Sequence, residues 1–449
     1  MWLPYIIISF PGVSTGDTLD ELSQFFHLDS SWSVKSINLL NENVYINKHH
    51  SVLHTVILGL IFKLGKMLGS FTFGVFIYVV FQVVLLLIIF SFMIKYMKKI
   101  KVNSMIIFLS VLFVGLNPTI AVFAICAIKD TPSSIFNLLY VIFLLQIVRN
   151  FDSIYKNKLR FLGLIFTILM VLLFRNNGIY TFLLSFPWLF LVYKNKWKKI
   201  LLTILVVIFM FYGYDKVLLP KFDISDGSIR EVLSIPVMQL SRVVHHKSEE
   251  FSISDKEIIN SVFNFEGMKS FYDPDLADNV KNRYNKDASS KDLKLFFGVW
   301  FKYLKKYPIM YIESVVNSTY GYFFPEKSED EIYLYDFNFK RYAYFDINHI
   351  EVFETPRNIF NQLLYIYYKL PFFINKVAYY DWFLLFSIIY IITKKKYKYL
   401  VPLSALFAVL LSCFASPVNG SFRYIMPIIF SAPIILSIDY LVYNESKKD

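Results

Sequence analysis

Ten long apolar runs constrain this chain more than any other feature of its sequence. They lie at about 1–13, 72–94, 104–128, 132–148, 161–174, 178–193, 200–214, 377–393, 399–418 and 424–443. The second run has 23 residues and no charge, and a helix needs about 20 mainly apolar residues to cross the hydrocarbon core of a bilayer. A mean hydropathy of +0.49 agrees with this pattern. The sequence therefore predicts an all-α polytopic membrane protein with about ten transmembrane helices.

The links between these runs alternate in charge. Eighteen Lys and Arg residues lie in five links or ends: 95–101, 149–160, 194–199, 394–398 and the tail after Tyr443. One each lies in three short links: 129–131, 175–177 and 419–423. Because short basic loops are retained in the cytoplasm, we expect a multi-pass cell-membrane protein with both chain ends cytoplasmic. The net charge of +12 then reflects topology, and nucleic acid is not an expected partner.

Two long stretches lie outside the apolar runs, 14–71 and about 215–376, and the charge alternation assigns both to the outer side. The sequence thus predicts an N-terminal membrane module at 1–214, a large extracytoplasmic, mostly helical domain at 215–376 and C-terminal membrane helices at 377–449. Within the domain, 292–323 is expected to form one amphipathic helix. Its aromatic stripe either meets lipid headgroups or packs in the domain core.

The segment 51–70 is apolar enough to span a membrane. A span there would invert every later loop and place the eighteen basic residues outside. Lys63 and Lys66 also lie three residues apart, on one face of a helix. We therefore expect this segment to lie in the outer interface as a helix. The first run is shorter than a span, so it is either the outer end of a helix whose beginning is missing or a segment that dips into the membrane.

Four acidic residues at the expected outer membrane edge are candidate catalytic groups: Asp17, Asp20, Glu21 and Asp130. A carboxylate in this position can remove a proton from a hydroxyl group. For the first three, the alternative is a helix N-terminus, with Thr15 or Asp17 capping a helix that begins near Thr18. Both roles are compatible, because a cap also fixes a carboxylate.

Three cations stand alone in the outer links: Lys129, Arg175 and Arg423. The positive-inside bias disfavours Lys and Arg on this side, and polar groups at membrane depth are functional candidates by default. Arg binds phosphate oxygens as a fork and Lys as a point charge, so a lipid-linked phosphate is a fitting ligand. The alternative is that these side chains reach out to the headgroup phosphates of the bilayer.

Three histidines cluster around the start of the expected interfacial helix: His49, His50 and His54. His50 and His54 have the i, i+4 spacing of metal ligands, but no matching carboxylate pattern follows them on the helix. Hydrogen bonds to a substrate, or a plain interfacial location, are favoured over a metal site. No cofactor is therefore predicted, and a divalent cation remains an open alternative. A P-loop is absent, which argues against nucleotide hydrolysis.

Taken in order, these motifs resemble the GT-C class of integral-membrane glycosyltransferases, which includes the protein O-mannosyltransferases and the aminoarabinose transferases. The matching elements are FPG at 10–12 with Asp17, an HHxxLHT-like element at 49–55, the pair Lys129 and Asp130, RNNG at 175–178, and the late pair Arg423 and Tyr424. The chain looks closer still to an uncharacterised bacterial branch with YPG…D, HHP..HT, KD and RNNG elements. It departs from the class in lacking prolines in HHSVLH and in spreading its acids as GDTLDE.

The resemblance implies inverting transfer of a sugar from a polyprenyl-phosphate donor to a cell-envelope acceptor (a glycan, lipid or protein) on the outer face. Asp17 would be the general base and Asp130 would assist it, with Asp20 and Glu21 as alternatives for the base. Arg175 and Arg423 would hold the leaving phosphate. Substrate-binding roles are implied for the other motif residues: His49, His50, His54, Lys129 and Tyr424.

Two other classes share part of this layout. A polysaccharide polymerase or ligase also combines many spans with a large outer loop and outer arginines. A transporter or flippase is less well supported, because the apolar runs contain only Asp381 and Asp439 as charged residues, each near an end. A carboxylate beside the phosphate-binding cations would favour the transferase.

Overall fold

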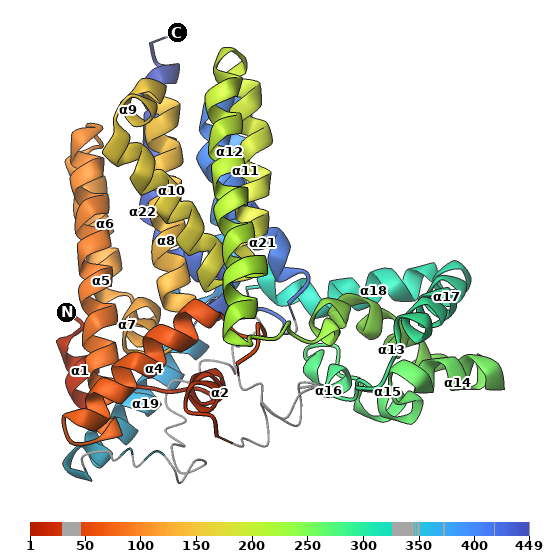
Figure 1. Ribbon diagram of the computed structural model, residues 1–449. Coiled ribbons are helices and arrows are strands. Elements are labelled where there is room, and N and C mark those ends of the chain that lie inside the picture. The colour runs from red at the N-terminus through yellow and green to blue at the C-terminus, as the bar shows by residue number, and fades with distance from the viewer. Residues whose placement is uncertain are drawn as a thin grey trace.

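The computed structural model describes residues 1–28, 46–325, 345, 347, 351–370, 373–416 and 418–448, and it is all-α as the sequence predicts. Within these residues the chain forms 21 α-helices. Long helices stand side by side as a bundle, and a compact group of shorter helices projects sideways from one end of it (Figure 1). The bundle contains α5 (Phe71–Lys99), α6 (Ser104–Leu116), α7 (Pro118–Ile125), α8 (Asp130–Arg149), α9 (Phe151–Tyr155), α10 (Lys158–Phe174), α11 (Gly178–Val192), α12 (Trp197–Tyr212), α20 (Val377–Thr393), α21 (Leu400–Cys413) and α22 (Phe422–Ser446).

Four helical segments are long and apolar enough to cross a membrane: Phe71–Lys99, Asp130–Arg149, Lys194–Phe222 and Phe422–Ser446. The pair α6 and α7 adds a fifth if it acts as one broken span, because the chain bends by 50° between these helices. The prediction of about ten spans is therefore wrong: the described residues support four or five, with three further apolar helices of only 10–17 residues. Several apolar helices still indicate a multi-pass membrane protein.

Hydropathy overestimates the number of spans because it does not record where a helix breaks. Pro118 has no N–H to continue α6, and Asn117 caps α7 by accepting a hydrogen bond from Thr119 N at 2.9 Å. The first apolar run forms only the six-residue helix α1 (Leu3–Ile8). The apolar side chains of α21 are mostly buried by neighbouring helices, so their hydropathy reflects the protein core as much as lipid.

Lipid-facing surface is expected where long apolar helices expose their side chains. On α12, Leu202 is 52% exposed and Phe209 is 78% exposed. By contrast α8 lies at the centre of the bundle, where Ile142 and Leu145 are fully buried. The central helix therefore holds its polar first turn inside protein, away from lipid.

Two short helices at one end of the bundle position the acidic and histidine motifs. α2 (Gly16–Phe25) begins with a capping box in which Thr15 and Thr18 exchange side-chain and backbone bonds, so Thr15 takes the expected cap role. α4 (Val52–Met67) has 16 residues and runs obliquely across the lower end of the bundle (Figure 1). It packs tightly, since a Cβ at Gly65 would lie 2.1 Å from the α5 backbone.

The side group has a hydrophobic core of its own. Its helices are α13 (Ser234–Lys247), α14 (Ile253–Val262), α15 (Phe265–Phe271), α16 (Asp278–Lys281), α17 (Ser290–Lys306) and α18 (Pro308–Thr319). Pro308 divides the single helix expected at 292–323 into α17 and α18. Tyr303 and Tyr311 are each 1% exposed and lie in this core, which favours the packing alternative for the aromatic stripe.

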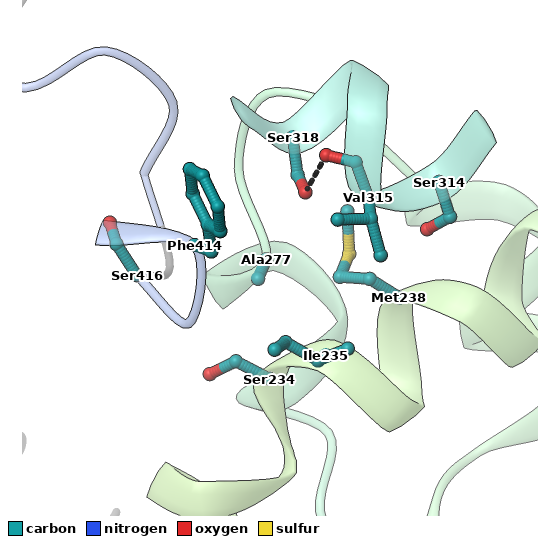
Figure 2. A pocket seen from close by; sticks show the side chains of 9 residues that line it. All are labelled: Ser234, Ile235, Met238, Ala277, Ser314, Val315, Ser318, Phe414 and Ser416. Carbon is teal, nitrogen blue, oxygen red and sulfur yellow. Dashed lines mark hydrogen bonds between the residues drawn. The ribbon is translucent and has the colours of Figure 1, made fainter. Parts of the chain in front are cut away.

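The boundaries of the side group differ from the expected 215–376. The helix that begins as α12 continues to Phe222, and α19 (Glu354–Lys369) packs on the bundle, where Tyr5 meets Phe360. The compact group therefore lies within about 229–322. Figure 2 shows its junction with the bundle, a pocket lined by Ser234, Ile235, Met238, Ala277, Ser314, Val315, Ser318, Phe414 and Ser416.

Candidate functional site

Main-chain pairing brings the first acidic motif next to the loop 126–130. Val13 N donates to Ile125 O at 3.0 Å, and Ala127 N donates to Val13 O at 2.8 Å. The Thr18 hydroxyl then donates to Ala127 O at 2.7 Å. Both the chain before α2 and the first turn of α2 are therefore fixed to the loop that carries the second acidic motif.

Gln82, a buried amide in α5, holds the other side of this loop. Its Nε2 lies 2.9–3.0 Å from three main-chain carbonyl oxygens, those of Phe123, Ala124 and Cys126. A buried carbonyl without a donor costs about 1–3 kcal/mol. Gln82 thus stabilises the conformation in which the loop 126–130 presents its charged residues.

Three cations from three links converge on two carboxylates. Lys129 Nζ donates to Asp17 Oδ2 at 3.1 Å, and Arg423 Nη2 donates to the same oxygen. Arg423 Nε also donates to Asp130 Oδ2 at 2.6 Å, while Arg175 Nε lies 3.1 Å from Asp130 Oδ1. The Asp130 side chain is 1% exposed, whereas those of Asp17 and Arg423 are 29% and 27% exposed. Ligands can therefore reach this network along the edge formed by Asp17 and Arg423.

Two further contacts orient the arginines. The guanidinium carbon of Arg175 lies 4.7 Å from the centroid of the Tyr424 ring, a cation–π contact that favours a fixed plane. Arg423 follows a loop that the side group anchors, because Asn419 Nδ2 donates to Asp275 Oδ1 at 2.6 Å. The side group thus influences the site through the loop before α22.

A buried chain of hydrogen bonds lies behind the cations. Glu21 Oε2 bonds to His54 Nδ1, and His54 Nε2 lies 2.7 Å from the Tyr78 hydroxyl. Because a carboxylate only accepts, a neutral His54 carries its proton on Nδ1 and accepts from Tyr78 through Nε2. His50 Nδ1 accepts from Lys129 Nζ at 2.6 Å. The histidine motif is therefore joined to both the acidic motif and the cations.

Several buried polar atoms on this side have no hydrogen-bond partner among the described residues. They are Asp20 Oδ1, Glu21 Oε1 and His50 Nε2. Burial, with the charges of Asp17 and Glu21, raises the pKa of Asp20 to about 7. Burial also holds the pKa of His50 well below its usual value, so this imidazole is neutral. This side of the site thus combines two carboxylate oxygens and one imidazole N–H that lack hydrogen bonds with a carboxyl group whose pKa is about 7.

Asp17 differs from Asp20 in its proton affinity. Burial alone would raise the pKa of Asp17, but the positive charges of Arg423 and Lys129 outweigh that effect and hold the pKa well below its usual range. The two neighbouring carboxyl groups therefore have opposite shifts. Such a separation is the pattern expected where two acids take different roles.

Residues 39–448 match the sequence model of a family of unknown function, DUF6020. The chain belongs to this family. No curated protein and no solved structure matches it. The matched segment includes the histidines, Asp130 and the three cations, whereas Asp17, Asp20 and Glu21 precede it.

In this DUF6020 protein the side group adds charged residues that sequence reasoning missed. His49 Nδ1 lies 3.6 Å from Glu231 Oε1, and Arg230 Nε donates to the same oxygen at 3.0 Å. Lys281 Nζ donates to Glu231 Oε2 at 2.8 Å. No local pattern marks these residues, because their contact with His49 depends on how the side group docks.

Gln82 and Tyr78 were missed as well, although a signal for them exists. Both are polar groups within the charge-free run 72–94, and polar groups at membrane depth are functional candidates. Applied to neutral as well as charged residues, that rule would have selected both.

The structure gives the i, i+4 histidine pair no metal site. Within the described residues, no group of three or more His, Cys, Asp or Glu side chains is placed to hold a metal ion. His50 turns to Lys129, while His54 bonds to Glu21 and Tyr78. The two imidazoles therefore have different hydrogen-bond partners.

Proposed function

We propose that this protein is a membrane glycosyltransferase that moves a sugar from a polyprenyl-phosphate donor to a cell-envelope acceptor. One observation carries the proposal: carboxylates of α2 and α8 meet lone cations from three different links at one end of an apolar bundle. Inverting transfer needs both kinds of group. The acceptor oxygen bonds to the anomeric carbon and gives up its proton to a base, while the bond from that carbon to the phosphate oxygen breaks.

The arginines suit the departing phosphate. A guanidinium group has five N–H donors, and Arg423 uses only some of them on Asp17 and Asp130. A phosphate that reaches the exposed edge can replace Asp17 as the partner of Arg423 and Lys129. This exchange substitutes one anion for another and leaves the contacts of Asp130 in place, so little charge has to be desolvated anew.

A groove whose walls include the helices on either side of Arg175 supports a lipid-linked donor. It has a volume of about 300 Å³ and lies between α10, α11 and α12, where it is lined by Leu172, Ile179, Phe182, Val207, Ile208, Phe211, Tyr212, Asp215 and Lys216. The α10–α11 turn that carries Arg175 joins two of its walls. Apolar walls that end in charged residues suit an isoprenoid tail with a polar head.

Asp20 fits the role of base better than Asp17 in this arrangement. A general base works best with a pKa near the operating pH, and the pKa of Asp20 is about 7. Its Oδ1 also has no partner within the described part of the chain. Asp17 instead bonds to two cations. We assign Asp17 to the placement of those cations and Asp20 to proton removal.

The test is transfer by the purified protein in lipid vesicles, offered a panel of polyprenyl-phosphate sugars. Asp20→Asn should abolish transfer but retain donor binding, because the amide keeps the shape and cannot accept the proton. Asp152→Asn, on α9 at the far end of the bundle (Figure 1), is the matched control and should be fully active. Near-normal transfer by Asp20→Asn would move the base to Asp17 or Glu21. No turnover by the wild type with any donor would reject the transferase.

A further inference from the structure

The side chains of α19 divide into three longitudinal faces. One face packs on the bundle through Arg357, Leu364 and Tyr368, which are 4–7% exposed. The two other faces are exposed. Because successive residues turn by about 100° around a helix, their side chains can be assigned to separate stripes.

The first exposed stripe is apolar. Ile359, Leu363, Ile366 and Leu370 follow one another at spacings of four, three and four residues and are 54%, 58%, 55% and 40% exposed. This is the spacing of side chains that lie along one line of a helix. A single exposed apolar residue needs no explanation, but a continuous line marks a surface that something covers.

The second exposed stripe is polar and lies beside the first. Glu354, Asn358, Gln362 and Lys369 are all exposed, and none of them falls on the apolar line. Tyr365, which is 57% exposed, lies in the same stripe, where the Lys369 ammonium is 4.2 Å from its ring centroid. A helix with adjacent apolar and polar exposed stripes fits a boundary between hydrocarbon and water.

The neighbours of α19 indicate what covers its apolar stripe. Its inner face touches α1, where Arg357 Nε donates to Ile8 O at 3.3 Å and Phe360 packs on Tyr5. α1 itself exposes Leu3 and Ile7, at 63% and 45%. Both helices of this pair therefore have outward-facing apolar side chains, and they lie at the end of a bundle that has the composition of a membrane domain.

We propose that α19 is an interfacial helix, with its apolar stripe in the acyl chains of the bilayer and its polar stripe in water. Its inner face also packs Tyr368 against Phe422, whose ring centroid is 5.8 Å away. Phe422 immediately precedes Arg423. An anchored α19 thus holds the first turn of α22, and the cation network with it, at the level of the lipid headgroups.

Spin labels on adjacent residues of α19 test the proposal independently of any activity. Leu363→Cys and Gln362→Cys, each in protein whose Cys126 and Cys413 are replaced by Ala, would be labelled and placed in phosphatidylcholine–phosphatidylglycerol vesicles. We expect the label at 363 to collide with oxygen and to be shielded from a water-soluble nickel reagent. The label at 362 should show the reverse. Ile359→Cys and Asn358→Cys form a second pair with the same expected contrast.

Two results would overturn the inference. Equal access of the nickel reagent to positions 362 and 363 would mean that the apolar stripe faces water. An immobile label at 363, shielded from both reagents, would mean that protein covers the stripe, such as a second copy of this chain. If one cysteine pair prevents folding, the other pair gives the same decision.

Discussion

The two halves of the site use buried charge in opposite ways. The cation half contains Asp17, Asp130, Arg175 and Arg423, and both of its carboxylates have charged partners at hydrogen-bond distance. The histidine half contains Asp20, Glu21, His50 and His54, and it leaves three buried polar atoms without hydrogen-bond partners among the described residues. In the cation half Asp130 Oδ1 also lacks a hydrogen bond, but it lies 3.1 Å from Arg175 Nε. Buried groups without hydrogen bonds have the capacity to bind further polar groups. The first half is thus suited to hold an anion and the second to accept protons.

Apart from loss of the base, removal of Arg423 should have the largest effect on transfer, because this residue joins both carboxylates of the cation half. Arg423→Gln should lower kcat/KM by about 100-fold or more, the scale of losing a preorganised charge donor. Arg423→Lys should lower kcat/KM by less, because the lysine keeps the positive charge although it lacks the two-pronged guanidinium. Transfer from a polyprenyl-phosphate sugar in vesicles measures both.

Arg160→Gln is the matched control for this prediction, because the Arg160 side chain donates only to a main-chain oxygen, that of Ser153, among the described residues. It should retain wild-type activity. If Arg423→Gln stays within about threefold of that control, the cation half has no part in phosphate binding.

The sequence was sufficient to predict the fold class but not the number of membrane spans. Apolar runs identify helices, and the described residues are all-α. The predicted number of spans was wrong because composition does not show where a helix breaks. One such break lies between α6 and α7, at Asn117 and Pro118. A second reason is that the apolar residues of α21 are buried in protein. Hydropathy does not distinguish a helix buried in protein from one that faces lipid.

The site was partly accessible to sequence reasoning for a related reason. Isolated charges such as Arg175 and Arg423 stand out in short links of an otherwise apolar chain, so the charge pattern selects them. Glu231 does not stand out, because it lies among many charged residues of the side group. Its distance of 3.6 Å from His49 depends on docking of the side group, which local patterns do not encode.

Gln82 should matter to both halves, since the loop that it holds supplies Asp130 to the cation half and also Lys129, which bonds to Asp17 in that half and to His50 in the other. Gln82→Leu leaves three carbonyl oxygens without this donor, and should cost about 1–3 kcal/mol of stability and roughly tenfold in transfer. Gln146→Leu on α8 is the control. Equal thermal stability and activity for the two variants would remove Gln82 from the positioning role.

The pH dependence of transfer can separate Asp20 from Asp17 as the base. With Asp20 in that role, activity should rise as the pH increases through about 7, because the ionised form accepts the proton. Asp17→Asn removes a negative charge that raises the pKa of Asp20, so the rise should move to lower pH. Complete loss of activity in Asp17→Asn, together with retained activity in Asp20→Asn, would instead make Asp17 the base. An unchanged pH profile would show that the two carboxyl groups are not coupled.

The last expected effect is on stability and not on transfer: the free energy of unfolding should rise at high pH. Native Asp20 has a pKa of about 7, above the value of about 3.9 for an unfolded aspartate. Between these values the native state binds more protons than the unfolded state, so stability falls as the pH rises and the penalty is complete above pH 7. Asp20→Asn removes the charge and should stabilise the protein at pH 8, by up to about 4 kcal/mol. The gain should shrink toward pH 4.

Thermal unfolding in detergent measures this gain in stability, with Asp152→Asn as the control that should show no gain. If Asp20→Asn loses stability equally at both pH values, Asp20 is a structural hydrogen-bond acceptor, and the contrast between the two halves of the site no longer holds.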